Sequence, residues 1–231
     1  MKILTIIPAR CGSKGIKDKN IIDVCGKPLI VYSIDLALNL KKLGFVDEVL
    51  VSTDCQAISD IASKYGATPP FLRPKSISND TSKSIEYCIN ALKYFKKLNK
   101  EFDAVLLLQP TSPIRSLDLL KNAIKLFKSE KNDSLISVYK EEYINDLVMY
   151  NNTSSTKLKP LNDNHNKGLR RQEHGYTFVR NGAIYLTRTP FLISKNLIIS
   201  DNPLYIEMEK SNSINIDNIE DLKLIRKIIC G

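Results

Sequence analysis

Apolar residues along the chain alternate between short continuous runs and longer stretches with helical spacing. The continuous runs are typical of strands that are buried on both faces. They cover residues 2–8, 48–53, 102–108 and 134–139. The stretches with helical spacing cover residues 28–40, 58–65, 85–95 and 119–127. Strands that alternate with helices predict an α/β fold, with a Rossmann-like, mostly parallel sheet and helices on both faces.

Residues that favour helix ends mark several boundaries of these elements. Pro28 is expected to open the first helix, and Gly66 is expected to close the second. Asp80 or Thr81 is expected to cap the third helix, and Ser116 the fourth. The predicted helices therefore have definite starts and stops.

The alternation breaks between about residues 141 and 178. This segment is rich in asparagine and contains few long apolar runs. It is either an irregular insertion or an arm that reaches a second subunit, and we favour the arm because a long ordered loop usually has a function. Two further strands, residues 181–186 and 203–209, and a final helix, residues 219–229, follow it. We expect one domain, residues 1–231, with an inserted dimerisation arm at approximately residues 141–178.

The composition limits the class of protein. Hydrophobic residues make up 43% of the 231 residues and charged residues 26%, which is usual for a globular protein with a buried core. No apolar run approaches the roughly 20 residues of a transmembrane helix, and Met1–Ala9 is interpreted as a buried strand, not as a signal sequence. The net charge of +9 is compatible with nucleic acid, an anionic membrane or a small anionic substrate, and it does not choose among them.

The five cysteines are spread widely along the chain. They are Cys11, Cys25, Cys55, Cys88 and Cys230, and they lack the paired spacing of a zinc site. Because their number is odd and their spacing is wide, we expect no disulfide framework. The sequence therefore predicts a protein of the reducing cytoplasm.

A segment that combines glycines with cations follows the first predicted strand. Gly12 and Gly15 allow the backbone to approach a ligand closely, so that its N–H groups can face phosphate oxygens. Arg10 and Lys14 place positive charge beside them, at the end of a strand, where open α/β sheets bind ligands. The spacing matches neither the dinucleotide-binding pattern nor the P-loop. We expect a phosphate site of another type, and the alternative is a glycine turn with surface cations.

Six motifs stand out along the chain. The first is I-P-A-R-x-G-S-K-G-x-x-x-K-N, at residues 7–20. The others are Val51–Asp54, Leu72–Pro74 with Asp80–Thr81, Leu107–Arg115, Asn181–Tyr185 and Ser213–Asp217. In their order and residues, these motifs resemble those of the sugar-acid cytidylyltransferases, and of the CMP–sialic acid synthetases in particular. The resemblance covers nearly the whole chain and is weakest across residues 141–170. The related Kdo cytidylyltransferases lack the S-K-G and K-N elements of the first motif.

The resemblance implies a nucleotidyltransferase-type fold and a transfer of CMP. The anomeric hydroxyl of a nine-carbon 2-keto sugar acid would attack the α-phosphorus of CTP, giving a CMP-sugar and pyrophosphate. Such a displacement depends on positioning and on stabilisation of phosphate charge, so Mg²⁺ or Mn²⁺ is the expected cofactor. The resemblance also implies a homodimer in which the arm of one subunit completes the partner's sugar site. The expected location is the cytoplasm, with no nucleic acid and no membrane as a partner.

The resemblance also implies roles for individual residues. The expected catalytic residues are Arg10, Lys14 and Asp217. The residues expected to contact the nucleotide are Arg10, Gly12, Ser13, Lys14, Gly15, Lys19, Asn20, Arg73, Ser82 and Ser84. The residues expected to contact the sugar acid are Gln109, Arg171, Gln172 and Tyr185. The simpler alternatives are a turn at Arg73 and a helix cap at Ser82.

The expected metal ligands are Asp217 and Asn215, where the family typically has two aspartates. Alternate residues of a strand point the same way, so both side chains are expected to reach one ion. An amide in place of a carboxylate removes one negative charge and is expected to weaken the metal site. The alternative for Asp217 is a cap of the last helix. Asp54 is a secondary candidate for a metal or ribose contact, or it caps the helix that follows it.

The sugar pocket departs from the family as well. Sialic acid synthetases carry a lysine in the region of residues 143–148, and two aromatic residues where this chain has Leu197 and Ile198. A more aliphatic pocket suits a 9-deoxy, N-acylated acid, and the alternative is that Leu197 and Ile198 are core residues. The candidate sugars are therefore N-acetylneuraminic, legionaminic and pseudaminic acid.

Three other functions remain as alternatives. A nucleic-acid-binding protein would need aromatic residues interleaved with a basic stripe, which the lysines do not show. Asn215 leaves open a weakly active or regulatory homologue, and another sugar-nucleotide pyrophosphorylase would use a different base or sugar. His165 and His174 both lie in the irregular segment, so no Ser-His-Asp triad is expected.

Overall fold

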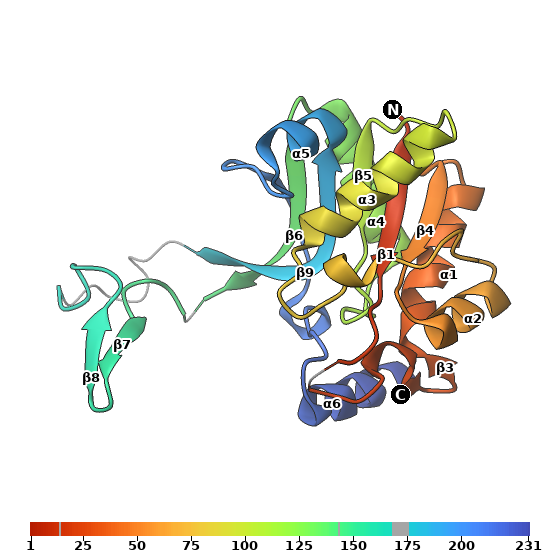
Figure 1. Cartoon of the computed structure of the whole chain (residues 1–231). Helices are drawn as coiled ribbons and strands as arrows, with labels where there is room; N and C mark the ends of the chain where they lie inside the picture. The colour runs from red at the N-terminus through yellow and green to blue at the C-terminus, as the bar shows by residue number, and fades with distance from the viewer. Residues whose placement is uncertain (14, 143, 168–175) are drawn as a thin grey trace.

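A six-stranded sheet forms the centre of the protein, with the strands in the order β10-β6-β9-β5-β1-β4 (Figure 1). The computed structural model describes residues 1–13, 15–142, 144–167 and 176–231. The strands are β1 (Ile3–Pro8), β4 (Glu48–Ser52), β5 (Ala104–Leu107), β6 (Ser134–Glu141), β9 (Thr177–Arg188) and β10 (Leu204–Glu207). β1 is parallel to β4 and β5, and β10 is parallel to β6, whereas β9 is antiparallel to both of its neighbours. The predicted Rossmann-like, mostly parallel sheet is confirmed.

Helices cover both faces of this sheet. They are α1 (Leu29–Lys42), α2 (Gln56–Lys64), α3 (Ser84–Lys97), α4 (Leu117–Ser129), α5 (Thr189–Lys195) and α6 (Ile219–Cys230). The side chains of β1 alternate between two cores. Ile3 and Ile7 pack with residues of α1, α2 and α4, whereas Leu4 and Ile6 pack with residues of α3 and α5. Both faces of β1 are therefore buried, as its continuous apolar sequence predicts.

Shorter elements lie between these strands and helices. They are the 3₁₀ helices η1 (Lys19–Ile21), η2 (Lys75–Ile77) and η4 (Lys210–Asn212), and the paired strands β2 (Asp23–Val24) and β3 (Lys27–Pro28). Among the helices of the described residues, none has the length and the hydropathy needed to cross a bilayer.

Local hydrogen bonds explain one confirmed and one wrong prediction of a helix start. Ser116 caps α4 as predicted. The predicted cap of α3 at Asp80 or Thr81 is wrong, because this helix begins later in the chain. Its first turn is closed by the Glu86 carboxylate, which accepts a hydrogen bond of 2.8 Å from the Lys83 N–H. Asp80 has a partner elsewhere, in the pocket described below.

The segment between β6 and β9 leaves the body of the protein. Its described part contains a two-stranded antiparallel hairpin of β7 (Tyr150–Ser154) and β8 (Lys157–Pro160), which Figure 1 shows standing away from the central sheet. Large apolar side chains on or beside this hairpin are exposed: Val148, Met149, Tyr150, Leu158 and Leu161. The break in the α/β alternation falls on this segment, and its role as a dimerisation arm stays a prediction.

Two disulfides join cysteines that are far apart in the sequence. Cys11 pairs with Cys55 and Cys25 pairs with Cys230, while Cys88 is a buried free thiol. The expectation of no disulfides is therefore wrong for four of the five cysteines. Wide spacing in the sequence is misleading because the parallel pairing of β1 with β4 places the loops after these strands side by side. The second disulfide ties the end of α6 to the turn between β2 and β3.

Candidate active site

An open pocket of about 430 Å³ lies beyond the carboxyl ends of the central strands. Pro8, the last residue of β1, and Gln109, just after β5, are both in its wall. The described residues that line it are Pro8, Arg10, Ser13, Gly15, Lys19, Asn20, Arg73, Ile77, Asn79, Asp80, Ser82, Tyr87, Gln109, Pro110, Thr111 and Asp217. This edge of the sheet is the one at which open α/β proteins bind ligands.

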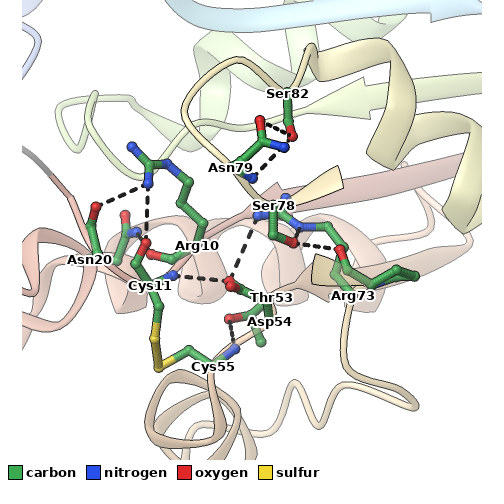
Figure 2. Close-up of polar contacts among 12 residues, drawn as sticks. Arg10, Cys11, Asn20, Thr53, Asp54, Cys55, Arg73, Ser78, Asn79 and Ser82 are labelled. Atoms are coloured by element: carbon green, nitrogen blue, oxygen red, sulfur yellow. Dashed lines mark hydrogen bonds and ion pairs between the residues drawn. A yellow bond between two sulfur atoms is a disulfide. The ribbon is translucent and has the colours of Figure 1, made fainter. Parts of the chain in front are cut away.

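The loop after β1 is folded around the side chain of Arg10 (Figure 2). Nη1 of Arg10 donates hydrogen bonds to the carbonyl oxygens of Cys11 and Gly12, at 3.2 and 3.0 Å. Nη2 lies 2.5 Å from a carboxylate oxygen of Asp80. Gly12 has a φ of +68°, a left-handed conformation that residues with a side chain adopt only at a cost. Arg10 thus stabilises the loop and places a positive charge at the pocket.

Arg73 contributes a second guanidinium to the pocket. The main-chain N–H of Arg73 donates a hydrogen bond of 2.6 Å to the main-chain carbonyl of Thr53, just after β4. Its side chain is buried, with Nε donating to the Ser78 hydroxyl at 2.9 Å and the guanidinium lying 5.2 Å from the Tyr87 ring centre. Burial lowers the pKa of Arg73, and the nearby Asp54 carboxylate opposes this shift. A buried guanidinium with a fixed orientation suits a planar or tetrahedral anion.

Asp54 joins the two segments that carry these arginines. Its Oδ1 accepts a hydrogen bond of 3.0 Å from the Cys11 N–H and lies 4.0 Å from Nη2 of Arg73. The N-cap position of α2 belongs to Cys55, the next residue. Asp54 therefore contacts the loop after β1 as well as the buried guanidinium.

A polar turn before α3 forms another part of the pocket wall. The Asn79 N–H donates to the Ser82 hydroxyl oxygen at 3.1 Å, and that hydroxyl donates to Oδ1 of Asn79 at 3.0 Å (Figure 2). The Thr81 hydroxyl donates to the same Oδ1 at 2.8 Å. These bonds fix the turn from which Asp80 reaches Arg10.

Lys19 and Asp217 meet at the pocket from opposite ends of the chain. Nζ of Lys19 donates a hydrogen bond of 2.8 Å to the Ile216 carbonyl and lies 3.3 Å from Oδ1 of Asp217. The Asp217 side chain is 76% exposed, so one face of its carboxylate remains open to solvent. Asn20 is buried and donates to the Arg10 carbonyl at 3.1 Å. Residues 19 and 20 thus connect the loop after β1 with the segment before α6.

Both the nitrogen and the oxygen of the Asn215 side-chain amide form hydrogen bonds. Nδ2 donates a hydrogen bond of 2.8 Å to the Asn181 carbonyl, and Oδ1 accepts one of 2.5 Å from the Ser112 hydroxyl. Residues 213–217 lie in an irregular segment, so the expectation that a strand places Asn215 and Asp217 side by side is wrong. Asn215 is not among the residues that line the described pocket. Its assignment as a metal ligand stays a prediction.

Gln109 lies close to β9. A Cβ at Gly182 would lie 3.3 Å from Oε1 of Gln109, and Gly182 has a φ of +76°, which glycine adopts readily. Glycine at this position therefore leaves room for an amide that can both donate to and accept from a substrate. Tyr185, further along the strand, is half-buried, and burial raises the pKa of its hydroxyl.

Arg115 stabilises the interior next to the site. Nη1 donates to the Ala183 carbonyl at 2.8 Å and Nη2 to the Ser33 hydroxyl at 2.5 Å, and burial lowers the pKa of Arg115 to about 9. We expect Arg115→Lys to lower the free energy of unfolding by about 2 kcal/mol or more, because a charge stays buried while its hydrogen bonds are lost. Urea denaturation measures this change.

Arg180→Lys is the matched control, because Arg180 is an exposed arginine on β9. It should change the free energy of unfolding by no more than about 0.5 kcal/mol. Equal stability of the wild-type protein and Arg115→Lys would show that the two hydrogen bonds of Arg115 contribute little.

The structure brings most of the predicted site residues together. Those that line the pocket are Arg10, Ser13, Gly15, Lys19, Asn20, Arg73, Ser82, Gln109 and Asp217. The predicted residues that are described but do not line it are Gly12, Ser84, Tyr185 and Asn215. Lys14, Arg171 and Gln172 lie outside the described residues, so their predicted roles stay predictions.

Several pocket residues were not predicted as site residues from the sequence. The sequence predicts a helix cap at Asp80 or Thr81, although Asp80 also lies in one of the six motifs that resemble the family. Tyr87 follows the apolar spacing of α3 and was not singled out, yet this buried side chain lines the pocket and stacks against Arg73. Asn79 has no sequence signal beyond its place in a polar turn.

Asp217 is the side chain that best fits a divalent cation. Among the described residues, no three His, Cys, Asp or Glu side chains form a metal-binding group. Mg²⁺ does not need such a group, because it is usually held by one or two carboxylates together with substrate phosphates and water. An exposed carboxylate in the pocket wall has the right chemistry for this role.

Comparisons with known proteins identify related sequences. The model of a family described as cytidylyltransferase matches residues 4–229. A pseudaminic acid cytidylyltransferase of Campylobacter jejuni is 34% identical, over 98% of this chain and 95% of its own. A CMP-N,N'-diacetyllegionaminic acid synthase of Legionella pneumophila is 32% identical, over 99% of this chain and 97% of its own. An N-acylneuraminate cytidylyltransferase of Escherichia coli is 33% identical, over 96% of this chain but 51% of its own.

A solved structure has the same fold. It is a CMP-2-keto-3-deoxy-manno-octonic acid synthetase complexed with CTP, with a TM-score of 0.73, 17% identity and coverage of 100% of this chain and 99% of that one. At this level of identity the likeness concerns the fold alone. The match of the family model along almost the entire sequence and the identities of the relatives together show that this chain belongs to the cytidylyltransferase family.

Proposed function

We propose that this protein transfers CMP from CTP to the anomeric hydroxyl of a nonulosonic acid and releases pyrophosphate. The observation that carries the proposal is that Arg10, Lys19, Arg73 and Asp217 line the same pocket, at the carboxyl edge of the sheet. Three cations suit a triphosphate. The names of the relatives support the substrate class, because they refer to pseudaminic, legionaminic and N-acylneuraminic acids.

The cations of the pocket would bind and orient the phosphates. Arg10 and Lys19 have carboxylate partners, Asp80 and Asp217, so a bound phosphate has to compete with these carboxylates. The Arg73 guanidinium is buried and already oriented, which limits the entropy lost on binding. Lys14 is the further phosphate ligand that we propose from the sequence motif.

Mg²⁺ or Mn²⁺ is the proposed cofactor, with Asp217 as the main protein ligand and Asn215 as a secondary candidate. When bound, the cation would neutralise charge on the phosphates. The residues of the chain then have to align the sugar hydroxyl with the α-phosphorus and exclude water from it. Gln109 is suitably placed to orient the sugar, because its amide lines the pocket.

We propose pseudaminic or legionaminic acid, rather than N-acetylneuraminic acid, as the sugar. The relatives named for these two acids match this chain along 95% and 97% of their own lengths. From the family resemblance we propose that Arg171 clamps the sugar carboxylate and that Gln172 and Tyr185 also contact the sugar acid. Leu197 is half exposed and Ile198 packs against the core around α3, so the described structure gives these two residues no contact with the pocket.

A homodimer in the cytoplasm completes the proposal. The exposed apolar side chains of the β7–β8 hairpin offer a surface that a second subunit would cover. The cytoplasmic location stays a prediction. The two disulfides bear on it, because disulfides are rare in reducing compartments such as the cytoplasm.

Release of pyrophosphate tests the proposed function. The enzyme is incubated with Mg²⁺, CTP or UTP, and each of the three sugar acids in turn. We expect release with CTP and the highest kcat/KM with pseudaminic or legionaminic acid. A preference for N-acetylneuraminic acid would contradict the sugar assignment, and faster release with UTP would favour another sugar-nucleotide pyrophosphorylase. No release with any acid would favour a weakly active or regulatory homologue.

A further inference from the structure

The disulfide between Cys11 and Cys55 lies in the loop after β1, next to residues that line the pocket but not itself among them. Cys11 stands between Arg10 and Ser13, which both line the pocket. Cys55 follows β4, and the two Cα atoms are 5.4 Å apart (Figure 2). The position of Cys11 is the variable residue in the I-P-A-R-x-G-S-K-G motif, so the motif itself does not require a cysteine there.

This disulfide attaches the loop after β1 covalently to the segment after β4. The other attachments seen among the described residues are non-covalent: the Cys11 N–H bonds to Asp54 at 3.0 Å, Asn20 bonds to the Arg10 carbonyl at 3.1 Å, and Nη2 of Arg10 pairs with Asp80 at 2.5 Å. Nη1 of Arg10 bonds to carbonyl oxygens within the loop itself, so it shapes the loop but does not attach it to β4. Breaking the disulfide would therefore leave the loop attached more weakly.

The two cysteines of this pair differ in their exposure to solvent, and therefore to an attacking thiolate. Cys11 is exposed and Cys55 is half-buried. Cys88 is buried, and burial raises the pKa of its thiol to about 12, so it is a poor partner for exchange. None of the four disulfide cysteines is among the residues that line the described pocket, but Cys11 directly follows Arg10, which does line it, whereas no neighbour of Cys25 or Cys230 in the sequence does. The Cys11–Cys55 pair is thus the one in which an exposed cysteine adjoins a residue of the pocket wall.

We propose that Cys11 and Cys55 form a thiol–disulfide exchange site whose redox state sets the affinity of the pocket for CTP. The reductant is a dithiol, either a small molecule or a protein. Its thiolate attacks the exposed Cys11 sulfur, a mixed disulfide forms, and Cys55 leaves as a thiolate that takes a proton. The second thiol of the reductant then displaces Cys11. Two electrons pass to the protein, which gains two thiols, and the reductant becomes a disulfide.

The oxidised form is the one with the higher affinity for CTP. In this form the loop is already fixed in the conformation that lines the pocket. In the reduced form, binding of CTP has to order the loop, and this ordering opposes binding. We expect reduction to raise the Kd for CTP by about threefold to tenfold. The effect on kcat should be smaller, because Asp217 and Lys19 belong to segments that the disulfide does not join.

The experiment compares three forms of the full-length chain: the wild type, the double variant Cys11→Ser/Cys55→Ser, and the control Cys25→Ser/Cys230→Ser. Each is oxidised in air or reduced with dithiothreitol, and the Kd for CTP is measured by titration calorimetry. Thiols are mapped in parallel by alkylation and mass spectrometry. We expect a redox-dependent Kd in the wild type and the control, and a constant, weak Kd in Cys11→Ser/Cys55→Ser.

The inference rests on the proposed function, and the outcomes separate the two. Equal Kd values for CTP in oxidised and reduced wild type would contradict the inference alone. So would alkylation of Cys11 and Cys55 in the air-oxidised protein, or loss of the redox response in the control. Absence of CTP binding in every form would contradict the proposed function as well.

Discussion

Replacing Asp217 by alanine is expected to lower kcat by about a hundredfold or more. The carboxylate is exposed in the pocket wall and lies 3.3 Å from the Lys19 ammonium, so its removal affects both the proposed metal and a neighbouring cation. Steady-state rates of pyrophosphate release at saturating CTP measure kcat. A titration with Mg²⁺ should show that Asp217→Ala needs a higher Mg²⁺ concentration for its half-maximal rate, because the proposed main protein ligand of the ion is gone.

Glu220→Ala is the matched control for Asp217→Ala. Glu220 is another exposed acidic residue, in the first turn of α6, and it does not line the described pocket. We expect its kcat and its Mg²⁺ requirement to stay within about twofold of the wild type. A kcat of Asp217→Ala in the same range would rule out the role that we propose for this carboxylate.

Gly15→Ala is expected to lower kcat/KM by about a hundredfold, because the pocket wall has to shift. A Cβ at Gly15 would overlap with the main-chain carbonyl oxygen of Asp217, and a backbone atom cannot rotate away as the end of a side chain can. The loop after β1 and the segment before α6 would move apart. Kinetics with CTP as the varied substrate would show the change in kcat/KM.

Gly44→Ala separates this effect from the general cost of replacing a glycine. Gly44 has a φ of +72° with open space around its Cβ position, and it lies in the turn after α1. The substitution should cost about 1 kcal/mol of stability and leave kcat/KM unchanged. Equal kcat/KM values for Gly15→Ala and the wild type would show that the loop and Asp217 are not packed as described.

The central sheet and its helices were predictable because their signals are local. Continuous apolar runs mark β1 and β5, and helical spacing with Ser116 as the cap marks α4. The antiparallel direction of β9 was not predictable in this way. Its direction depends on the path of the chain through the segment between β6 and β9, and hydrophobic spacing carries no information on strand direction.

The position of the pocket was predictable, but many of its contacts were not. Glycines and cations at the end of a strand have a clear physical meaning, which identified Arg10, and the family resemblance added Ser13 and Lys19. The partners of these residues come from distant parts of the chain. The contacts of Lys19 with Asp217 and of Arg10 with Asp80 depend on tertiary packing.

The same limit explains two wrong expectations, the absence of disulfides and the strand at residues 213–217. Cys11 and Cys55 are 44 residues apart, and the pairing of β1 with β4 brings them together. The family resemblance implies that Asn215 and Asp217 are metal ligands, and an expected strand would have pointed both side chains the same way. Instead, the Asn215 amide bonds to Asn181 and Ser112, which are remote in the sequence. Spacing alone predicts neighbours only where the secondary structure is regular.

Detection of the sugar nucleotide itself tests the proposed reaction most directly. The enzyme, Mg²⁺, CTP and either pseudaminic or legionaminic acid are followed by ³¹P nuclear magnetic resonance, which distinguishes a CMP-sugar phosphodiester from CMP and pyrophosphate. The predicted result is equal amounts of CMP-sugar and pyrophosphate, formed as CTP disappears. Pyrophosphate with CMP but no CMP-sugar, or unchanged CTP with both acids, would contradict a transfer of CMP to a nonulosonic acid.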